Sequence, residues 1–224
     1  MPKSPFAKRL DAVQAELAPL FRLHGFARHG RTFNRQTEDR LIQVVSLQMG
    51  QPAIGTLALL PAELAHLGRD LSGRFTVNLG VHLGEIWDCN NPRPAGHNLQ
   101  DHHCQIRARL GELCRMPDAW WPLDQPSSPL AFDIGRRLVA IGLPFLDRFR
   151  CRDDIIRDWV AFNADERLLS SRARVDVAVL LATRGDAAGA VRLLGEQVRA
   201  TPLKLHADYV RALARKLGLG ELPT

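Results

Sequence analysis

The chain has 224 residues, of which 46% are hydrophobic and 24% are charged. A chain of this length and composition can bury a substantial core, which excludes a disordered tail. No stretch approaches eighteen consecutive apolar residues, and the first segment, MPKSPFAKRLDAVQAEL, carries charges where a signal peptide is apolar. We therefore expect no membrane span and a cytoplasmic protein.

The net charge of +6 raises the question of nucleic acid binding. Acidic residues are interleaved with the arginines, as in RDDIIRD, and no run of five or six like charges occurs. The 30 basic residues are nearly all arginine, which indicates a GC-rich coding bias more than selection for phosphate contacts. We expect a solvated surface of mixed charge and do not expect nucleic acid as a partner.

The first predicted element is a helix over residues 4–24. Ser4 can cap this helix, and Pro5 occupies the first helical position, where its missing N–H costs no hydrogen bond. Gly25 is expected to end the helix. Pro19 is expected to kink or shorten the last turn. Apolar residues recur at helical spacing and make one face, namely Phe6, Leu10, Val13, Leu17, Leu20 and Phe21.

Strand patterns follow the helix. Residues 30–50 hold two runs around the turn at residues 37–40, which predict a hairpin whose second strand, residues 41–49, is covered on at least one face. Residues 51–73 predict a loop that carries a short helix at residues 61–67.

The stretch RFTVNLGVHL, residues 74–83, alternates between apolar and polar side chains and predicts a strand with its odd-numbered residues in the core. A polar loop is expected over residues 85–100. Residues 104–110 then alternate again, which predicts a further strand or the first turns of a helix. In the strand, Cys104, Ile106, Ala108 and Leu110 would face the core.

From Ser127 onward the pattern is helical. A helix over residues 127–149 is expected to be capped by Ser127 or Ser128 and broken at Pro144. Further helices are expected at residues 152–162, 168–183, 186–200 and 203–218. The stretch VAVLLATRGDAAGAVRLLGEQVRATP resembles one tetratricopeptide-type hairpin, which is too short for a peptide-binding groove.

These elements predict an α+β fold. An N-terminal helix would pack on a mostly antiparallel sheet in a domain of residues 1–126, followed by a helical C-terminal region of residues 127–224.

Six motifs occur in order along the first two thirds of the chain: GFARHGRTFNR, LIQVVSLQ, FTVNLGV, HCQIRARLGEL, WWPL and LPFLDRF. Together they resemble a bacterial family known as domain of unknown function 4304, over about residues 6–150. The resemblance implies an α+β domain of bacterial cytosolic proteins and brings no established catalytic residues.

The tetrapeptide DHHC, residues 101–104, matches the signature of membrane palmitoyltransferases, but those enzymes need transmembrane helices and a cysteine-rich zinc domain, which we do not expect here. A metal site is a second interpretation, because candidate ligands gather in this part of the sequence. However, there is no C-x₂-C pair and no histidine pair at i, i+4 on a helix, and neighbouring histidines on an extended segment would point to opposite faces. We expect no metal and no cofactor. The residues considered are His82, Cys89, His97, His102, His103 and Cys104.

Nucleophilic catalysis by Cys104 would need an exposed thiolate, whereas the strand pattern buries this residue as a structural thiol. The four cysteines are expected to be reduced, and Trp120 and Trp121 are interpreted as core and loop anchors. No nucleophile elbow, phosphate-binding loop or zinc-protease motif is present, so the sequence proposes no catalytic residue.

The polar face of the predicted sheet remains as a candidate site. If the strands at 74–83 and 104–110 are neighbours, their polar residues project from one surface, where two arginines could hold a carboxylate or phosphate. Arginines paired with acids, or a solvated face, are the alternatives. The candidate residues are Thr76, Asn78, His82, Gln105, Arg107 and Arg109.

We therefore predict a non-enzymatic binding or protein-interaction module whose partner is another protein or a small anionic ligand. The alternative is an anion-binding domain or an enzyme built around Asn78, His82, Arg107 and Arg109.

Overall fold

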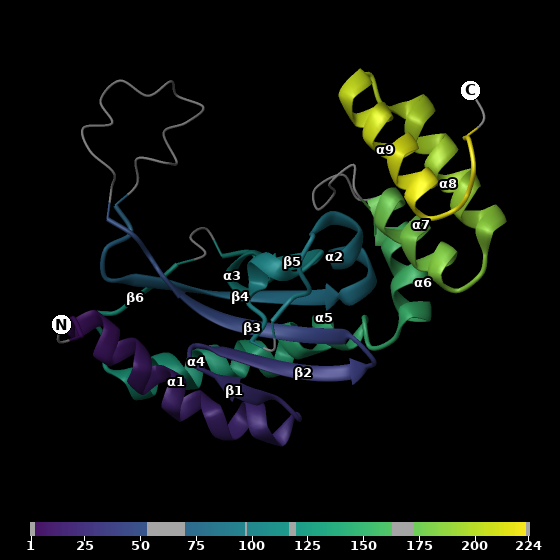
Figure 1. Ribbon diagram of the computed structural model, residues 1–224. Helices are drawn as coiled ribbons and strands as arrows, with labels where there is room; N and C mark the ends of the chain where they lie inside the picture. Colours follow the sequence, from purple (N-terminus) through teal and green to yellow (C-terminus); the bar gives the residue numbers. More distant parts are fainter. Residues whose placement is uncertain (1–2, 53–69, 97, 117–119, 163–172, 223–224) are drawn as a thin grey trace, which may run out of the picture. The chain divides into compact units, whose positions relative to one another are not determined.

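The computed structural model describes residues 3–52, 70–96, 98–116, 120–162 and 173–222 (Figure 1). The chain divides into two compact units. The first unit consists of residues 1–35, 43–81 and 98–146, and the second consists of residues 36–42, 82–97 and 147–224. Segments that are far apart in the sequence therefore build each core.

The first helix, α1, spans Pro5–Leu23, as predicted. Ser4 caps it, since the Ala7 amide donates to the Ser4 hydroxyl oxygen at 3.1 Å. Gly25 follows the helix with a φ of +81°, which glycine adopts without strain. The helix continues for another turn beyond Pro19, so this proline does not shorten it.

The described strands form one sheet in the order β1-β2-β3-β4-β5, with β6 paired to the start of β4. The hairpin predicted around residues 37–40 is confirmed, with Arg40 in the left-handed conformation at its turn. The strands β1 and β6 were not predicted, because two or three residues are too few to show alternation. The bounds are β1 Ala27–His29, β2 Thr32–Glu38, β3 Leu41–Met49, β4 Arg74–Leu83, β5 Ile106–Arg109 and β6 Trp121–Pro122.

One face of this sheet packs on helices of the first unit. The odd-numbered residues of β4, from Phe75 to Leu83, are fully buried, as predicted. Leu79 lies against the helical segment at Gly142, where an added β-carbon would be 3.4 Å from the Leu79 side chain. Helix α4 packs beside α1 in the same unit (Figure 1). The helical segments are α4 Ser127–Arg137, the π-helical turn η3 Leu138–Gly142 and α5 Leu143–Asp147.

The prediction that Ser127 or Ser128 caps the helix over residues 127–149 was wrong. Its N-cap is Pro126, and no side chain caps it. The break expected at Pro144 takes the form of the π-helical turn η3, which ends just before that proline. Because proline has no N–H, a wider turn at this point leaves fewer hydrogen bonds broken.

The described part of the second unit consists of helices, strand ends and the loops between them. Consecutive helices from α6 to α9 pack on one another, and α2 packs on α7. Asp186 caps α8 by accepting a hydrogen bond from the Gly189 amide at 2.8 Å. The bounds are α2 Gly84–Asn90, α6 Arg152–Phe162, α7 Ala173–Thr183, α8 Ala187–Ala200 and α9 Lys204–Lys216.

Taken together, the helices and the antiparallel sheet confirm the α+β class. The expectation of a loop from residue 85 was wrong, because α2 occupies the first part of that stretch. The short helix expected at residues 61–67 lies outside the described residues. The likeness of α7 and α8 to a tetratricopeptide hairpin stays a prediction.

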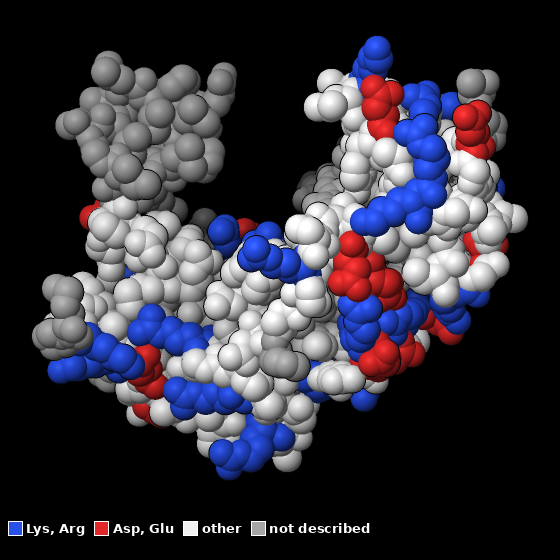
Figure 2. Space-filling model, in the orientation of Figure 1, with Lys and Arg blue, Asp and Glu red and all other residues white. Residues whose placement is uncertain are grey.

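The described helices include none that is long and apolar enough to cross a membrane. Arginine and acidic side chains lie next to each other on the face drawn in Figure 2. Exposed pairs such as Arg192 with Glu196 and Arg211 with Asp208 lie within single helices. Each of these two arginines therefore has an acidic partner one turn away on its own helix.

Candidate functional site

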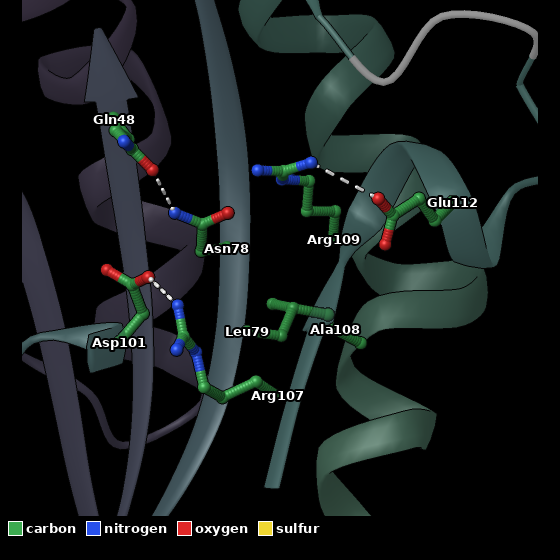
Figure 3. Close-up of a pocket in the computed structure, with 8 residues that line it drawn as sticks. All are labelled: Gln48, Asn78, Leu79, Asp101, Arg107, Ala108, Arg109 and Glu112. Atoms are coloured by element: carbon green, nitrogen blue, oxygen red, sulfur yellow. Dashed lines mark hydrogen bonds and ion pairs between the residues drawn. The ribbon is translucent and has the colours of Figure 1, made fainter. Parts of the chain in front are cut away.

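A polar cavity of about 320 Å³ lies in the first unit, over strands β3, β4 and β5 (Figure 3). Its size is at the lower end of the range for small-molecule sites. Four of its eight lining residues are arginines or amides on strands. The other four are one acid from η2 (Asp101–His103), one acid from α3 (Leu110–Leu113) and two apolar residues from β4 and β5. The lining residues are Gln48, Asn78, Leu79, Asp101, Arg107, Ala108, Arg109 and Glu112.

Pairing of β4 with β5 brings the two arginines to one face. Asn78 is the direct partner of Arg109, and Gly80 is the direct partner of Arg107. Because side chains alternate along a strand, all of these positions face away from the side on which Leu79 packs on the helices. The cavity and the helical layer thus lie on opposite faces of the sheet.

Arg107 is held by a carboxylate that is itself fixed. Its guanidinium lies 3.3 Å from an Asp101 oxygen, and the other Asp101 oxygen accepts a hydrogen bond from the Ser46 hydroxyl at 2.9 Å. Only 15% of the Asp101 side chain is exposed, whereas about half of the Arg107 side chain is exposed. Asp101 is therefore the rigid member of the pair.

Arg109 is held more loosely. It lies 3.3 Å from Glu112, and the side chains of this pair are 43% and 55% exposed. Both arginine–acid pairs have the same length, which exceeds the length of about 2.7–2.9 Å for charge-assisted hydrogen bonds of good geometry, so the two pairs differ in the exposure of the acid and not in length. The Arg109 guanidinium also lies over the Trp120 ring, 5.6 Å from its centre. The aromatic contact orients the arginine while its ion pair stays open to solvent.

Two amides complete the polar wall. The Asn78 amide nitrogen donates to the Gln48 side-chain oxygen at 2.8 Å. Asn78 is buried and Gln48 is exposed, so the hydrogen bond holds Gln48 across the strands β3 and β4. Amide groups beside arginines can both donate to and accept from a polar ligand.

The structure thus brings three of the six candidate residues, Asn78, Arg107 and Arg109, into one cavity. Thr76 is buried and does not line it. His82 is also buried, with its ring 5.9 Å from that of Trp87 in the second unit. Gln105 is half-buried and donates to the His103 carbonyl at 3.3 Å.

The region around Cys104 differs from the prediction. Residues 101–103 form a 3-10 helix, η2, and not an extended segment, so the His102 and His103 rings lie together with centres 4.0 Å apart. Strand β5 begins only at Ile106, and Leu110 opens α3. As a result, Cys104 packs against Gly80, on the polar face of β4, and not beside Ile106 on the helical side.

Cys104 is nevertheless buried, and burial raises the pKa of its thiol. A thiol that stays protonated is a poor nucleophile. Among the residues that the structure describes, no three His, Cys, Asp or Glu side chains are grouped so as to hold a metal ion. His97, one of the ligands considered from the sequence, lies outside them.

Sequence reasoning missed Gln48, Asp101 and Glu112 as cavity residues. Gln48 stands on β3, whose run of apolar residues hid its polar face. Asp101 belongs to the tetrapeptide DHHC, which attracted attention for other chemistry. Glu112 follows Arg109 by three residues, which is a signal for a helical ion pair once α3 is known.

A family model described as a domain of unknown function (DUF4304) matches residues 65–148. The resemblance expected from the motifs is confirmed over this stretch, while GFARHGRTFNR and LIQVVSLQ precede it. The match includes every charged residue of the cavity, but the description assigns no activity. No curated protein and no solved structure matches the chain.

Proposed function

We propose that this protein is a binding protein, bacterial and cytosolic, that holds a small ligand with a carboxylate or phosphate group in the polar cavity. The observation that carries the proposal is the pair of half-exposed arginines, Arg107 and Arg109, that line one cavity from one strand. Guanidinium groups bind carboxylates and phosphates through two parallel hydrogen bonds.

Arg109 is the principal contact in this proposal. Its ion pair with Glu112 is long and exposed, so a ligand anion can replace the glutamate at little cost. The Trp120 ring, whose centre lies 5.6 Å from the guanidinium, offers a cation–π contact that does not depend on the glutamate. The pair of Arg107 with Asp101 is equally long, but Asp101 is only 15% exposed and accepts a hydrogen bond from Ser46, so a ligand displaces this acid less easily than Glu112.

The acidic residues define the rest of the ligand. Two carboxylates balance the two arginines, so the cavity attracts no simple anion strongly from a distance. Asp101 and the Gln48 amide instead offer acceptors to hydrogen-bond donors on the ligand. The proposed ligand therefore carries an anionic group together with amine, amide or hydroxyl groups, at a size that suits about 320 Å³.

Binding is favoured over catalysis because the candidate catalytic groups lie outside the cavity lining. His82 is buried beside Trp87, and the Cys104 thiol is kept protonated by burial. A partner protein remains compatible with the proposal if it presents a carboxylate side chain or a phosphorylated residue to Arg109.

The test uses malonate and inorganic phosphate as probes of the arginine contact alone, without the ligand's further polar groups. The purified chain is titrated with each, and binding is followed by calorimetry and by the shift in melting temperature. Arg109→Gln should weaken malonate binding about ten- to a hundredfold, since a hydrogen bond to a charged group contributes about 1.5–3 kcal/mol. Glu112→Gln should strengthen binding, because it removes the competing carboxylate.

Arg211→Gln on α9 is a matched control. Arg211 pairs with Asp208 at 3.3 Å and i, i+3 spacing, and the two side chains are 42% and 53% exposed, almost as for Arg109 and Glu112. This variant should bind malonate like the wild type. Equal losses in both arginine variants, or no binding by the wild type at millimolar anion, would contradict the proposed site.

A further inference from the structure

An apolar face lies on helices α1 and α4 of the first unit, on the opposite side of the sheet from the polar cavity. Phe132 is 76% exposed there, and Val139 is also exposed. Large apolar side chains grouped at the surface of a folded unit mark interaction sites. We call this surface the α1/α4 face. Its members recur at helical spacing: Glu16 and Leu20 on α1, and Ser128, Phe132, Arg136 and Val139 on α4 and η3.

The face is hollow as well as apolar. A groove of about 780 Å³ runs between the two helices and is lined by small residues such as Ala131, Gly135 and Ala140. A β-carbon on Gly135 would lie 3.6 Å from the side chains of Leu17 and Leu20, so this glycine lets the helices approach closely. The surface therefore contains both a projecting ring, Phe132, and a depression.

The charges on this face have a defined order along α4. Glu16 lies at the first turn of α4, where its carboxylate accepts a hydrogen bond from the Ser127 hydroxyl at 2.6 Å. Arg136 lies nine residues after Ser127, which is about 13.5 Å at 1.5 Å per residue. Asp133 lies near this end as well, but it contacts Arg137 at 2.8 Å and Arg136 only at 3.4 Å. The Arg136 side chain is 70% exposed, so its positive charge is available to a partner. The groove thus has an acidic end and a basic end, and Phe132 lies midway between them.

We propose that the α1/α4 face binds a second copy of this chain in a two-fold symmetric dimer. An isologous interface needs a surface that complements itself. A two-fold axis beside Phe132 turns the groove end for end, which brings Glu16 of each copy to Arg136 of the other. The two Phe132 rings then meet at the centre, where binding energy concentrates.

The observation that selects this occupant is the charge order. A partner with a uniformly charged or neutral apolar helix would leave one end of the groove unmatched. A second copy in the reversed direction matches both ends. The proposal does not depend on the polar cavity, which lies on the other face of the sheet.

The experiment is sedimentation equilibrium of the full chain over a range of concentrations. The wild type should show a reversible monomer–dimer equilibrium with a dissociation constant on the order of micromolar. Phe132→Glu should weaken the dimer at least about 100-fold, because it places two carboxylates at the centre of the interface. Leu205→Glu on α9, where the leucine is 84% exposed, should leave the equilibrium unchanged.

Charge reversal tests the symmetry. Glu16→Arg and Arg136→Glu should each weaken self-association, because each creates two like-charged contacts per dimer. A mixture of these two variants should associate again, since arginines of one chain then meet glutamates of the other at both ends. The chain that carries both substitutions should also dimerise.

A monomeric wild type at millimolar concentration would overturn the proposal, and so would a dimer that Phe132→Glu leaves intact. Single charge variants that lose the dimer without recovery on mixing would overturn the two-fold arrangement. Circular dichroism of each variant checks that the fold is retained, which we expect because Phe132, Glu16 and Arg136 are not core residues.

Discussion

Gly80, in the middle of β4, determines what can pack on the polar face of the sheet. A β-carbon at this position would stand 2.6 Å from the Cys104 sulfur and 2.7 Å from the Cys104 β-carbon. Real side chains do not approach so closely, and Cys104 is buried, so it has little room to move. Glycine at position 80 is therefore a packing requirement and not a conformational one.

Gly80→Ala should destabilise the fold by about 1–3 kcal/mol, the usual cost of overpacking a core. Cys104→Gly removes both atoms of the clash, so the double variant should be less destabilised than the sum of the single variants. Urea denaturation of the four proteins measures this coupling. Gly96→Ala, where nothing lies within 4 Å, should change stability by less than about 0.5 kcal/mol.

The same two residues show why alternation alone misplaced Cys104. The sequence alternates correctly from Ile106 to Arg109, and those residues do form a strand. The 3-10 turn η2 shifts the phase just before the strand, and polar–apolar periodicity contains no signal for such a turn. A glycine at position 80 was the available clue that another group approaches β4 closely.

At the scale of elements, the first turn of α6 is fixed by one arginine. Arg152 contacts Glu85 of α2 at 2.5 Å, Glu38 of β2 at 3.0 Å and the Asp39 carbonyl at 2.7 Å, all within the second unit. The side chains of Arg152 and Glu85 are mostly buried. The planar guanidinium of Arg152 thus connects the start of α6 to the turn between β2 and β3 and to α2.

Arg152→Met should destabilise the chain by about 2–3 kcal/mol, because it leaves two carboxylates without their cation in a partly buried place. Arg152→Lys should recover only part of this loss, since an ammonium cannot reach three acceptors at once. Chemical denaturation measures both effects. Arg192→Met removes an exposed i, i+4 pair with Glu196 and should cost less than about 0.5 kcal/mol. An equal loss of stability in Arg152→Met and Arg192→Met would contradict the role of Arg152 in connecting these elements.

Elements with long, regular patterns were predictable, and short ones were not. The helix α1 and the strand β4 each show their period over many residues, so local propensity and tertiary packing agree. Helix α2 has seven residues and an N-cap, Leu83, that makes no side-chain hydrogen bond, so neither period nor capping signalled it. Packing of α2 against α7 therefore stabilises this short helix, because its own sequence has neither a helical period nor a side-chain cap.

At the scale of the whole molecule, about half of the candidate site followed from the sequence. Strand alternation placed Asn78, Arg107 and Arg109 on one face, because β4 and β5 pair as neighbours. The acids that pair with the arginines come from η2 and α3, whose positions depend on tertiary structure. The burial of Thr76 and His82 could not be predicted from the sequence. Alternation along a strand predicts which face a residue lies on, but not which other elements cover that face.

The polar cavity and the α1/α4 face lie on opposite sides of one sheet. We therefore expect anion binding and dimerisation to be independent of each other. The cavity uses residues that face away from the helices, whereas the α1/α4 face lies on the outer side of the helical layer. Substitutions separated by a sheet and a helix share no contacts, so their effects should add.

We therefore expect Phe132→Glu to bind malonate within about twofold of the wild type, because additive effects agree within about 0.3–0.5 kcal/mol. Arg109→Gln should in turn dimerise like the wild type. Calorimetry of the first variant and sedimentation of the second measure this directly. If loss of the dimer also abolished anion binding, the helical layer would transmit a change through the buried residues of β4. Leu79 would then be the first residue to examine by substitution, because it lines the cavity and also packs beside Gly142 in the helical layer.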